Sequence, residues 1–261
     1  MPSLSICIPV KDRSRCVVQG EDFSYAERDA GYWAPMTIYP LPQCLCSIAV
    51  ARQPLEDWEI VIADFHSEDW PLAEWVETMA TPIPVKIVQV DGPFSAGKGL
   101  NVAGDNASAD NMLFIGADVL VTHELIVEGL ARLAKGQLYV PQPTLYKDPA
   151  HHWRMVGTEF SGTQFMTREM WQRVGHFPEF RSPGLCDVVW FERAVKMMGD
   201  EHIVLQPHAG LFHQWHPHMK AWKCRHYPDA EGDEALKVAA WKAGKFHEHN
   251  IPWPPEETPG A

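Results

Sequence analysis

The chain has 261 residues, enough for one large domain or two small ones with a sizeable hydrophobic core. Apolar residues make up 46% and charged residues 21%, a composition typical of folded proteins rather than disordered or fibrous ones. Acidic residues outnumber Lys and Arg by 34 to 22, and the net charge of −12 disfavours a generic nucleic-acid binder, which usually carries a basic surplus. The counts of 13 His and 11 Trp are high, and they predict a site rich in both.

No stretch approaches the ~20 consecutive apolar residues that a membrane-spanning helix needs. The first residues have no basic flank before their apolar run, so they indicate a strand rather than a signal peptide. The six cysteines show neither a CxxC pair nor the spacing of a zinc site. We therefore expect reduced thiols and a cytoplasmic protein.

Alternating strand and helix patterns run through the first half of the chain. Strands are predicted over residues 4–10, 58–64, 85–90, 111–118 and 138–141, and helices over residues 43–53, 69–79, 99–107 and 122–135. This alternation predicts an α/β fold with a mostly parallel central sheet. Residues 14–42 interrupt it with aromatic residues and prolines, and a segment of this length favours a functional loop.

The second half is less regular. Helices are predicted over residues 168–174, 187–198 and 234–244, a strand over 203–205, and a Pro-rich tail over 251–261. No internal repeat or linker divides the chain. We therefore predict a single domain over residues 1–250, with a regular half up to about 141 and an irregular half over about 142–250.

Three acids follow predicted strands: Asp12, Asp64 and Asp118 each lie at or just past a strand end. In a parallel sheet the carboxyl ends of the strands share one edge, and ligands bind outside that edge. The three acids therefore predict a binding site there.

Ordered segments of the chain carry a family resemblance. They are residues 5–13 (SICIPVKDR), 60–69 (IVIADFHSED), 94–118 (beginning FSAGKGLNV and ending DNMLFIGAD), and 174–193 (beginning VGHFPE and containing Asp187 and Arg193). In this order they resemble GT-A-type nucleotide-sugar glycosyltransferases, above all family 2 and the related galactosyl- and N-acetylgalactosaminyltransferase groups. The resemblance spans about residues 4–218. It implies a Rossmann-like GT-A fold whose first half binds nucleotide and whose second half binds the acceptor.

The resemblance also implies a UDP-sugar donor. The residues that it implies for donor binding are Pro9, Lys11, Arg13, Asp64, Lys98, Asn101, Ala117 and Asp118. Asp64 would contact the uracil ring or ribose, although an acid at a strand end also serves as a turn residue or helix cap. Lys98 and Asn101 would face the ribose and diphosphate, although a loop Lys is equally often solvated.

Asp118 stands where the family's DxD motif has its last Asp, and the resemblance implies that it ligates Mn²⁺ or Mg²⁺ bridging the diphosphate. In related groups a His after the last core strand completes the metal shell. The segment 213–218 (HQWHPH) offers His213 as the favoured ligand and His216 as the next. An imidazole ligand favours Mn²⁺ over Mg²⁺. The alternative is a surface cluster of His and Trp.

The chain departs from the family pattern at several positions. The first Asp of DxD is Gly116, an Arg often found near Lys98 is Ala96, and Cys186 replaces the acid that commonly precedes the catalytic base. The segment 14–42 has no counterpart in the family pattern. These departures leave open a weakened metal site, metal-independent catalysis, or sugar-nucleotide binding without turnover.

Asp187 stands at the position of the catalytic carboxylate of the inverting groups, so the resemblance implies that it deprotonates the acceptor hydroxyl. The alternative is a helix N-cap. Trp153, Trp190 and Trp215 are candidates for stacking on an acceptor sugar, with core packing as the alternative for each.

The leading hypothesis is a UDP-sugar-dependent, metal-dependent and inverting glycosyltransferase, with retention still open. The acceptor is a saccharide or another hydroxyl compound. A modified nucleic-acid base, as in viral base glycosylation, stays open because Lys220, Lys223 and Arg225 form a local basic patch. The alternatives are a catalytically silent sugar-nucleotide-binding module and a metal-dependent hydrolase built on His and Asp.

Overall fold

The computed structural model describes residues 2–53, 56–79, 82–150, 154–156, 162–180 and 186–217. The predicted features that lie outside the described residues are Trp153, the basic patch at 220–225, the helix over 234–244 and the tail over 251–261. The predicted domain limits therefore stay a prediction. Among the described residues, no helix is both long enough and apolar enough to cross a membrane.

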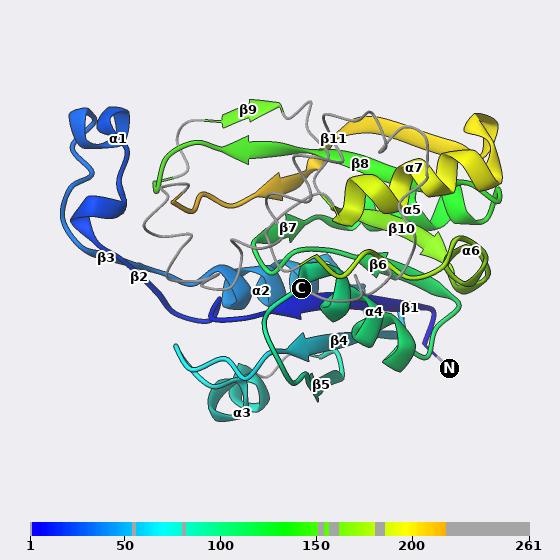
Figure 1. Ribbon diagram of the computed structural model, residues 1–261, viewed down its shortest axis with the longest axis horizontal. Coiled ribbons are helices and arrows are strands. Elements are labelled where there is room, and N and C mark those ends of the chain that lie inside the picture. The colour runs from blue at the N-terminus through cyan, green and yellow to red at the C-terminus, as the bar shows by residue number, and fades with distance from the viewer. Residues whose placement is uncertain are drawn as a thin grey trace, which may run out of the picture.

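Within the described residues, nine strands form one large sheet (Figure 1). The strands are β1 (Leu4–Val10), β4 (Trp58–Asp64), β5 (Val85–Gln89), β6 (Asn111–Phe114), β7 (Val119–Val121), β8 (Leu138–Tyr146), β9 (Arg154–Val156), β10 (Gln164–Thr167) and β11 (Ile203–His213). Their order across the sheet is β5-β4-β1-β6-β10-β8-β11-β7, and β9 pairs with β8.

The neighbouring strands β5, β4, β1 and β6 are all parallel, so their carboxyl ends share one edge. Within this sheet, each antiparallel pair includes a strand that follows residue 118: β10 with β6 and β8, β7 with β11, and β9 with β8. β8 and β11 are parallel to each other. The predicted α/β fold with a Rossmann-like parallel sheet is confirmed.

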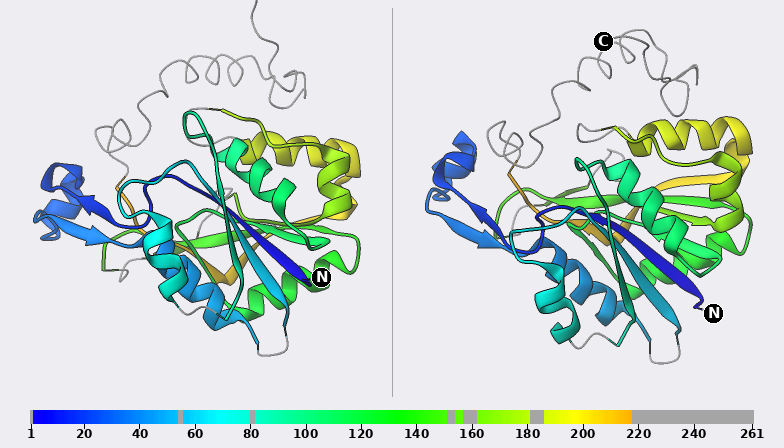
Figure 2. Two further views of the ribbon diagram at one scale, coloured as in Figure 1. Left: turned by 90° about the horizontal axis from the view of Figure 1, so that it is seen from below. Right: turned by 60° about the horizontal axis from the view of Figure 1, so that its bottom comes forward.

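Helices cover both faces of the sheet (Figure 2). On one face lie α2 (Pro40–Ala51), α3 (Leu72–Trp75) and α5 (His123–Leu133), and on the other lie α4 (Ala96–Asn106), α6 (Arg168–Val174) and α7 (Cys186–Met198). Ile6 and Ile8 of β1 join the first core, whereas Cys7 between them joins the second. A strand buried on both faces needs apolar residues throughout, which explains the continuous apolar run of β1.

Several elements differ in extent from the prediction. The helix predicted over 69–79 is α3 followed by a 3-10 turn, η2 (Val76–Met79). The strand predicted over 111–118 ends at Phe114, and a separate strand, β7, begins at Val119. α2 begins at Pro40 rather than at residue 43, because a proline is tolerated in the first helical turn. β11 continues past residue 205 to His213, with a register shift between Pro207 and Phe212.

The prediction of a loop over residues 14–42 is wrong for its central part. Residues 16–38 form an arm that contains β2 (Cys16–Val18), η1 (Gly20–Asp22), α1 (Tyr25–Asp29) and β3 (Met36–Ile38). β2 and β3 pair antiparallel, and the arm projects from one end of the sheet (Figures 1 and 2). Strands of three residues are too short to show the alternation that predicts a strand.

Candidate functional site

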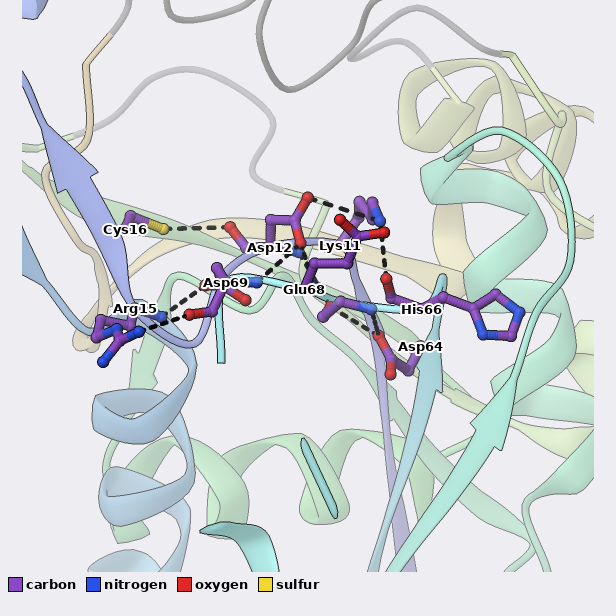
Figure 3. Close-up of polar contacts among 9 residues, drawn as sticks. Lys11, Asp12, Arg15, Cys16, Asp64, His66, Glu68 and Asp69 are labelled. Atoms are coloured by element: carbon purple, nitrogen blue, oxygen red, sulfur yellow. Dashed lines mark hydrogen bonds and ion pairs between the residues drawn. The ribbon is translucent and has the colours of Figure 1, made fainter. Parts of the chain in front are cut away.

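Hydrogen bonds join the loops that leave β1 and β4 at the carboxyl edge of the sheet (Figure 3). Asp12 Oδ1 accepts from the backbone N–H groups of Glu68 (2.8 Å) and Asp69 (3.4 Å). The Asp12 N–H donates to Ser67 Oγ at 3.0 Å. One carboxylate therefore anchors the second loop to the first.

Two further contacts reinforce this edge (Figure 3). Lys11 Nζ donates to the His66 carbonyl at 2.8 Å and lies 3.6 Å from Asp12 Oδ2. In the same direction, from the loop after β1 to the loop after β4, the Arg15 N–H donates to Asp69 Oδ2 at 2.6 Å. Lys11, a predicted donor-binding residue, thus lies at the expected edge with its charge beside the loop after β4.

The same edge contains two residues in the left-handed region of backbone conformation. Among the described residues other than glycine, Asp12 (φ 51°) and His66 (φ 54°) are the ones with positive φ. At His66 a residue with a side chain thus adopts a conformation that favours glycine. Such strain persists only where surrounding contacts hold it, and it often lies at binding sites.

Asp64 is the last residue of β4 and is 3% exposed. Its Oδ1 accepts from the Ser67 N–H (3.0 Å) and the Ser67 hydroxyl (2.7 Å), and Gln89 Nε2 donates to its Oδ2 (3.2 Å). A carboxylate can accept about four hydrogen bonds. The three bonds to Asp64 hold the turn after β4, so about one acceptor position remains for a ligand.

Asp118, His213 and His216 lie together. His213 Nε2 is 3.8 Å from Asp118 Oδ1, and His216 Nε2 is 3.5 Å from Asp118 Oδ2. One donor atom from each of the three lies within 4.8 Å of the others. Strand pairing brings them together, because His213 at the end of β11 pairs with Val119 at the start of β7.

The charge state of this cluster suits a cation. Burial raises the pKa of Asp118, whereas His213, His216 and Arg13 lower it. The lowering by these charges outweighs the effect of burial, so the net pKa lies below the usual value. Asp118 is therefore ionised at neutral pH. One carboxylate and two imidazoles are a donor set that divalent transition metals accept, so these residues fit the implied metal.

Gly116 has a specific packing role beside Asp118. A Cβ at Gly116 would lie 2.7 Å from Asp118 Oδ1. The Asp118 carboxylate thus occupies the space next to Gly116, the position where the family pattern has the first Asp of DxD. A side chain at position 116 would have to displace Asp118.

The remaining donor-binding candidates on this side are buried. Pro9 packs closely against α4, since a Cβ at Gly99 would lie 2.6 Å from Pro9 Cβ. Ala117 is 5% exposed and Arg13 is 7% exposed. The Arg13 carbonyl accepts from the Leu41 N–H at 2.9 Å, which ties the β1 loop to the start of α2.

Lys98 lies in the first turn of α4, which Ser95 caps by accepting the Lys98 N–H at 3.2 Å. Lys98 Nζ donates to the Asp91 carbonyl at 2.8 Å. Its ammonium is thus held by the loop that precedes α4.

Asn101, predicted to face the ribose and diphosphate, makes contacts within the protein, and its role in donor binding stays a prediction. Asn101 is 3% exposed, and its amide is committed to the segment that follows α6. Its Oδ1 accepts from the Phe177 N–H (2.7 Å), while its Nδ2 donates to the Phe177 carbonyl (2.9 Å) and to Glu179 Oε1 (3.1 Å). Asn101 thus fixes the VGHFPE segment.

α7 also holds this segment through hydrogen bonds. Trp190 Nε1 donates to the Gly175 carbonyl at 2.6 Å, and Arg193 Nη1 donates to the carbonyls of Val174 (3.2 Å) and His176 (3.1 Å). Trp190 is fully buried. It packs in the core, which is the alternative given for this residue, and its acceptor role stays a prediction.

Trp215 is also buried, at 4% exposed. It stacks on Phe23 with ring centroids 5.7 Å apart and an interplanar angle of 12°. Its Nε1 donates to Glu27 Oε1 at 2.6 Å. Trp215 therefore packs against the arm, and its acceptor role stays a prediction. Trp153 lies outside the described residues.

Asp187 lies in the first turn of α7 and is half-buried. The start of α7 lies beside the start of α4, since a Cβ at Gly97 would lie 3.4 Å from Cys186 Cβ and 1.8 Å from the Pro178 carbonyl oxygen. α4 in turn contacts Pro9 at the end of β1. This chain of contacts sets the position of Asp187 relative to the carboxyl edge.

The sequence analysis missed several side chains that hold this site. The spacing of Asp64 and Ser67 is a turn signal that could have identified Ser67. Gln214 donates from its N–H to the Asp118 carbonyl (2.8 Å) and from its Nε2 to the Pro40 carbonyl (2.9 Å). The contacts of Gln214 span 174 residues to Pro40, and no local pattern signals them.

Comparisons with solved structures find the same fold. S. aureus TarS 1–349 in complex with UDP-GlcNAc matches with a TM-score of 0.61 and 16% identity over 87% of this chain and 61% of that one. The mannosyltransferase PcManGT from Pyrobaculum calidifontis in complex with GDP-Man and Mn²⁺ matches with a TM-score of 0.57 and 17% identity over 90% of this chain and 64% of that one. The chain thus spans about three fifths of the length of these structures, and the likeness concerns the fold.

No curated protein sequence matches the chain. The family model described as glycosyl transferase family 2 does match, over residues 40–218. This range is more than half of the chain and includes Asp64, Asp118, Asp187 and both histidines of the cluster. The predicted GT-A fold and family resemblance are confirmed, and the chain belongs to glycosyl transferase family 2.

Proposed function

We propose that this chain transfers a sugar from a UDP-sugar to an acceptor hydroxyl, with a divalent metal ion and inversion at the anomeric carbon. The observation that carries the proposal is the cluster of Asp118, His213 and His216 beside the carboxyl edge of a family 2 sheet. The acceptor class is a saccharide or another hydroxyl compound. Cytoplasmic location stays a prediction.

Two observations support the donor assignment. Asp64 is fixed by Ser67 and Gln89 and keeps an acceptor position that the N–H of a uracil ring can use. S. aureus TarS, with the same fold, has been solved with UDP-GlcNAc and with UDP. PcManGT carries GDP-Man, so the guanine nucleotide is the competitor to test.

The metal assignment rests on the ligand chemistry. Asp118, His213 and His216 would hold the ion, and two imidazole donors favour Mn²⁺ over Mg²⁺. PcManGT has been solved with Mn²⁺. When bound, the ion supplies positive charge that stabilises the departing diphosphate.

Asp187 is the proposed general base. Its carboxylate takes the proton of the acceptor hydroxyl while that oxygen bonds to the anomeric carbon, and the bond from that carbon to the diphosphate oxygen breaks with its electron pair leaving on UDP. In the first turn of α7, the positive end of the helix dipole favours the ionised carboxylate, which is the form that can accept a proton.

Binding and turnover are measured separately. We expect UDP to bind in the presence of Mn²⁺ more tightly than GDP by calorimetry. We expect Asp187→Asn to keep UDP binding and to lose about 100-fold or more of UDP release from a UDP-sugar with an acceptor. Asp118→Asn should weaken Mn²⁺ binding. Asp200→Asn, at an exposed acid in the 3-10 turn η3 (Asp200–His202), is the matched control and should leave binding and turnover unchanged.

The outcomes separate the alternatives. Tight UDP binding without turnover on any acceptor indicates a silent binding module, and tighter GDP binding overturns the donor assignment. Failure to bind either nucleotide contradicts the whole proposal.

A further inference from the structure

The two residues between His213 and His216 are both anchored. Gln214 bonds to the Asp118 carbonyl (2.8 Å) and, through its buried side chain, to the Pro40 carbonyl (2.9 Å). Trp215 is fixed by the arm. The segment that joins His213 to His216 is therefore held in place by both of its intervening side chains.

The anchoring matters most for His216. His213 is the last residue of β11, so strand pairing with Val119 places it. His216 follows after the strand has ended, and its position depends on the two residues before it. Trp215, its immediate neighbour, is therefore the side chain that sets where the His216 backbone lies.

The arm grips Trp215 through a ring and a carboxylate. Phe23 stacks on the indole, and Glu27 Oε1 accepts its N–H at 2.6 Å. Glu27 is itself fixed, because its Oε2 accepts from the Ser24 N–H at 2.5 Å and its own N–H donates to Ser24 Oγ at 3.3 Å. This reciprocal capping contact at the start of α1 holds the carboxylate in place for the indole.

The dependence runs in both directions. A two-stranded hairpin with strands of three residues is not stable alone in water. The small core of the arm consists of Val18 and Phe23 packed on Trp215, so the arm is ordered by the residue that it holds. The arm also lies outside the range of the family-model match, residues 40–218.

We propose that the arm is a positioning element for the metal site: Glu27 and Phe23 act through Trp215 to hold His216 within reach of Asp118. This inference rests on the metal site of the proposed function. Glu27 and Trp215 are positioning residues, and they orient a ligand as outer-shell contacts do in metalloproteins.

The test measures Mn²⁺ binding alone, by the loss of the electron paramagnetic resonance signal of the free ion. The variants are Glu27→Ala, Trp215→Phe and their combination, because Trp215→Phe keeps the ring stacking and removes only the N–H donor. We expect each single change to weaken Mn²⁺ affinity by about 10-fold. The combined variant should be no weaker than either single one, since both remove the same bond.

Three further measurements isolate positioning from folding. Glu27→Gln keeps an oxygen acceptor for the indole and should regain part of the affinity, whereas Glu21→Gln, at an exposed acid of the same arm, should change nothing. The absorption spectrum of bound Co²⁺ reports ligand geometry and should shift in Glu27→Ala. Unfolding by urea identifies any variant that has lost its fold, and Glu27→Gln then provides the comparison in a folded chain.

The failures are distinguishable. Wild-type affinity in both single variants, with Asp118→Asn abolishing Mn²⁺ binding, overturns the role of the arm and leaves the metal site intact. Absence of Mn²⁺ binding by the wild-type chain overturns the metal site of the proposed function together with this inference. Additive losses in the combined variant would show that the two residues act separately, and would also overturn it.

Discussion

At the scale of single residues, the β1–β4 edge keeps strained conformations in place through hydrogen bonds. His66 has φ 54°, its carbonyl is bonded to Lys11, and its ring lies 2.9 Å from Asp91 on the surface. A left-handed conformation costs a non-glycine residue about 1–2 kcal/mol. An exposed ion pair returns at most about 1 kcal/mol of that cost.

The first prediction therefore concerns His66. We expect His66→Val to lower the free energy of unfolding by about 1–2 kcal/mol, because a β-branched residue tolerates positive φ worst. His66→Gly should be as stable as the wild type or up to about 1 kcal/mol more stable. Urea unfolding gives the order. Asp91→Asn removes only the surface partner of His66 and should shift stability by less than about 1 kcal/mol. Equal stability of the Val and Gly variants would contradict the strain.

The second prediction concerns Glu59, at the opposite end of β4 from Asp64. Burial raises the pKa of Glu59. Hydrogen bonds from the Ser5 hydroxyl and from the N–H and hydroxyl of Ser108 lower it by a larger amount, so its net pKa lies below the usual value. A depressed pKa in the folded state adds stability above the unfolded-state pKa of about 4.3, and this stability is lost as pH falls through the folded-state pKa.

We therefore expect the wild-type chain to exceed Glu59→Gln in unfolding free energy by a constant margin between pH 6 and 8. The margin should shrink as the pH falls below about 4.3. Urea unfolding at several pH values measures it. The exposed Glu74→Gln variant is the control and should show a margin near zero throughout. A Glu59 margin that grows on acidification would reverse the sign and refute the assignment.

At the scale of elements, the segment between α6 and α7 is a junction. Asn101 of α4 and Trp190 of α7 both donate hydrogen bonds to its backbone carbonyls. α4 approaches it so closely that Gly97 has no room for a side chain beside the Pro178 carbonyl. The position of Asp187 therefore depends on the contact between two helices and not on α7 alone.

The third prediction uses this close approach. Gly97→Ala in an exposed helix would stabilise the chain by about 1 kcal/mol. Here the added Cβ meets the Pro178 carbonyl oxygen, so we expect a loss of about 1–3 kcal/mol and faster amide hydrogen exchange at the start of α7. Thermal unfolding and exchange measured by mass spectrometry test both. A stabilised variant would show that α4 and the segment are not in tight contact.

The elements that the sequence predicted correctly share one property: each is long enough to show the pattern of apolar residues that is typical of a strand or a helix. β1 and β4 match their predicted bounds because both are mostly apolar segments of seven residues that end next to charged residues. The strands of the arm could not be predicted for the opposite reason, since β2 and β3 have three residues each. β11 was cut short at residue 205 because Pro207 and Gly210 interrupt its apolar pattern.

The site shows a similar division. Asp118, His213 and His216 were singled out by motif order and by residue type, and the structure brings them together. Asn101, Trp190 and Trp215 were placed in binding roles, but each is buried. Residue type does not separate a Trp that lines a site from one that fills a core, because both roles use the same ring. That distinction depends on contacts with residues far away in the chain.

At the scale of the whole molecule, the candidate metal ligands connect strands from both halves of the chain. Asp118 follows β6 and His213 ends β11, so the two ligands lie close together only in the folded state. An ion that needs both ligands therefore binds the folded chain alone. A ligand that binds the folded state alone stabilises it by mass action.

The fourth prediction follows from this linkage. Mn²⁺ at about 100 times its dissociation constant should raise the free energy of unfolding by about 2.7 kcal/mol, and EDTA should reverse the gain. Mg²⁺ at the same concentration should raise it less, because imidazole donors suit Mn²⁺ better. Thermal unfolding measures each shift. Asp118→Asn should abolish the Mn²⁺ effect, and an undiminished shift in that variant would place the ion elsewhere.

The bond between Trp215 and Glu27 also bears on biosynthesis, because 188 residues separate its two ends. A ribosome adding about 5–20 residues per second takes roughly 10–40 s to cover that distance. During this interval Val18 and Phe23 of the nascent arm lack their packing partner. The arm is synthesised 188 residues before Trp215, so the nascent protein exposes a small apolar surface that chaperones can recognise until Trp215 arrives.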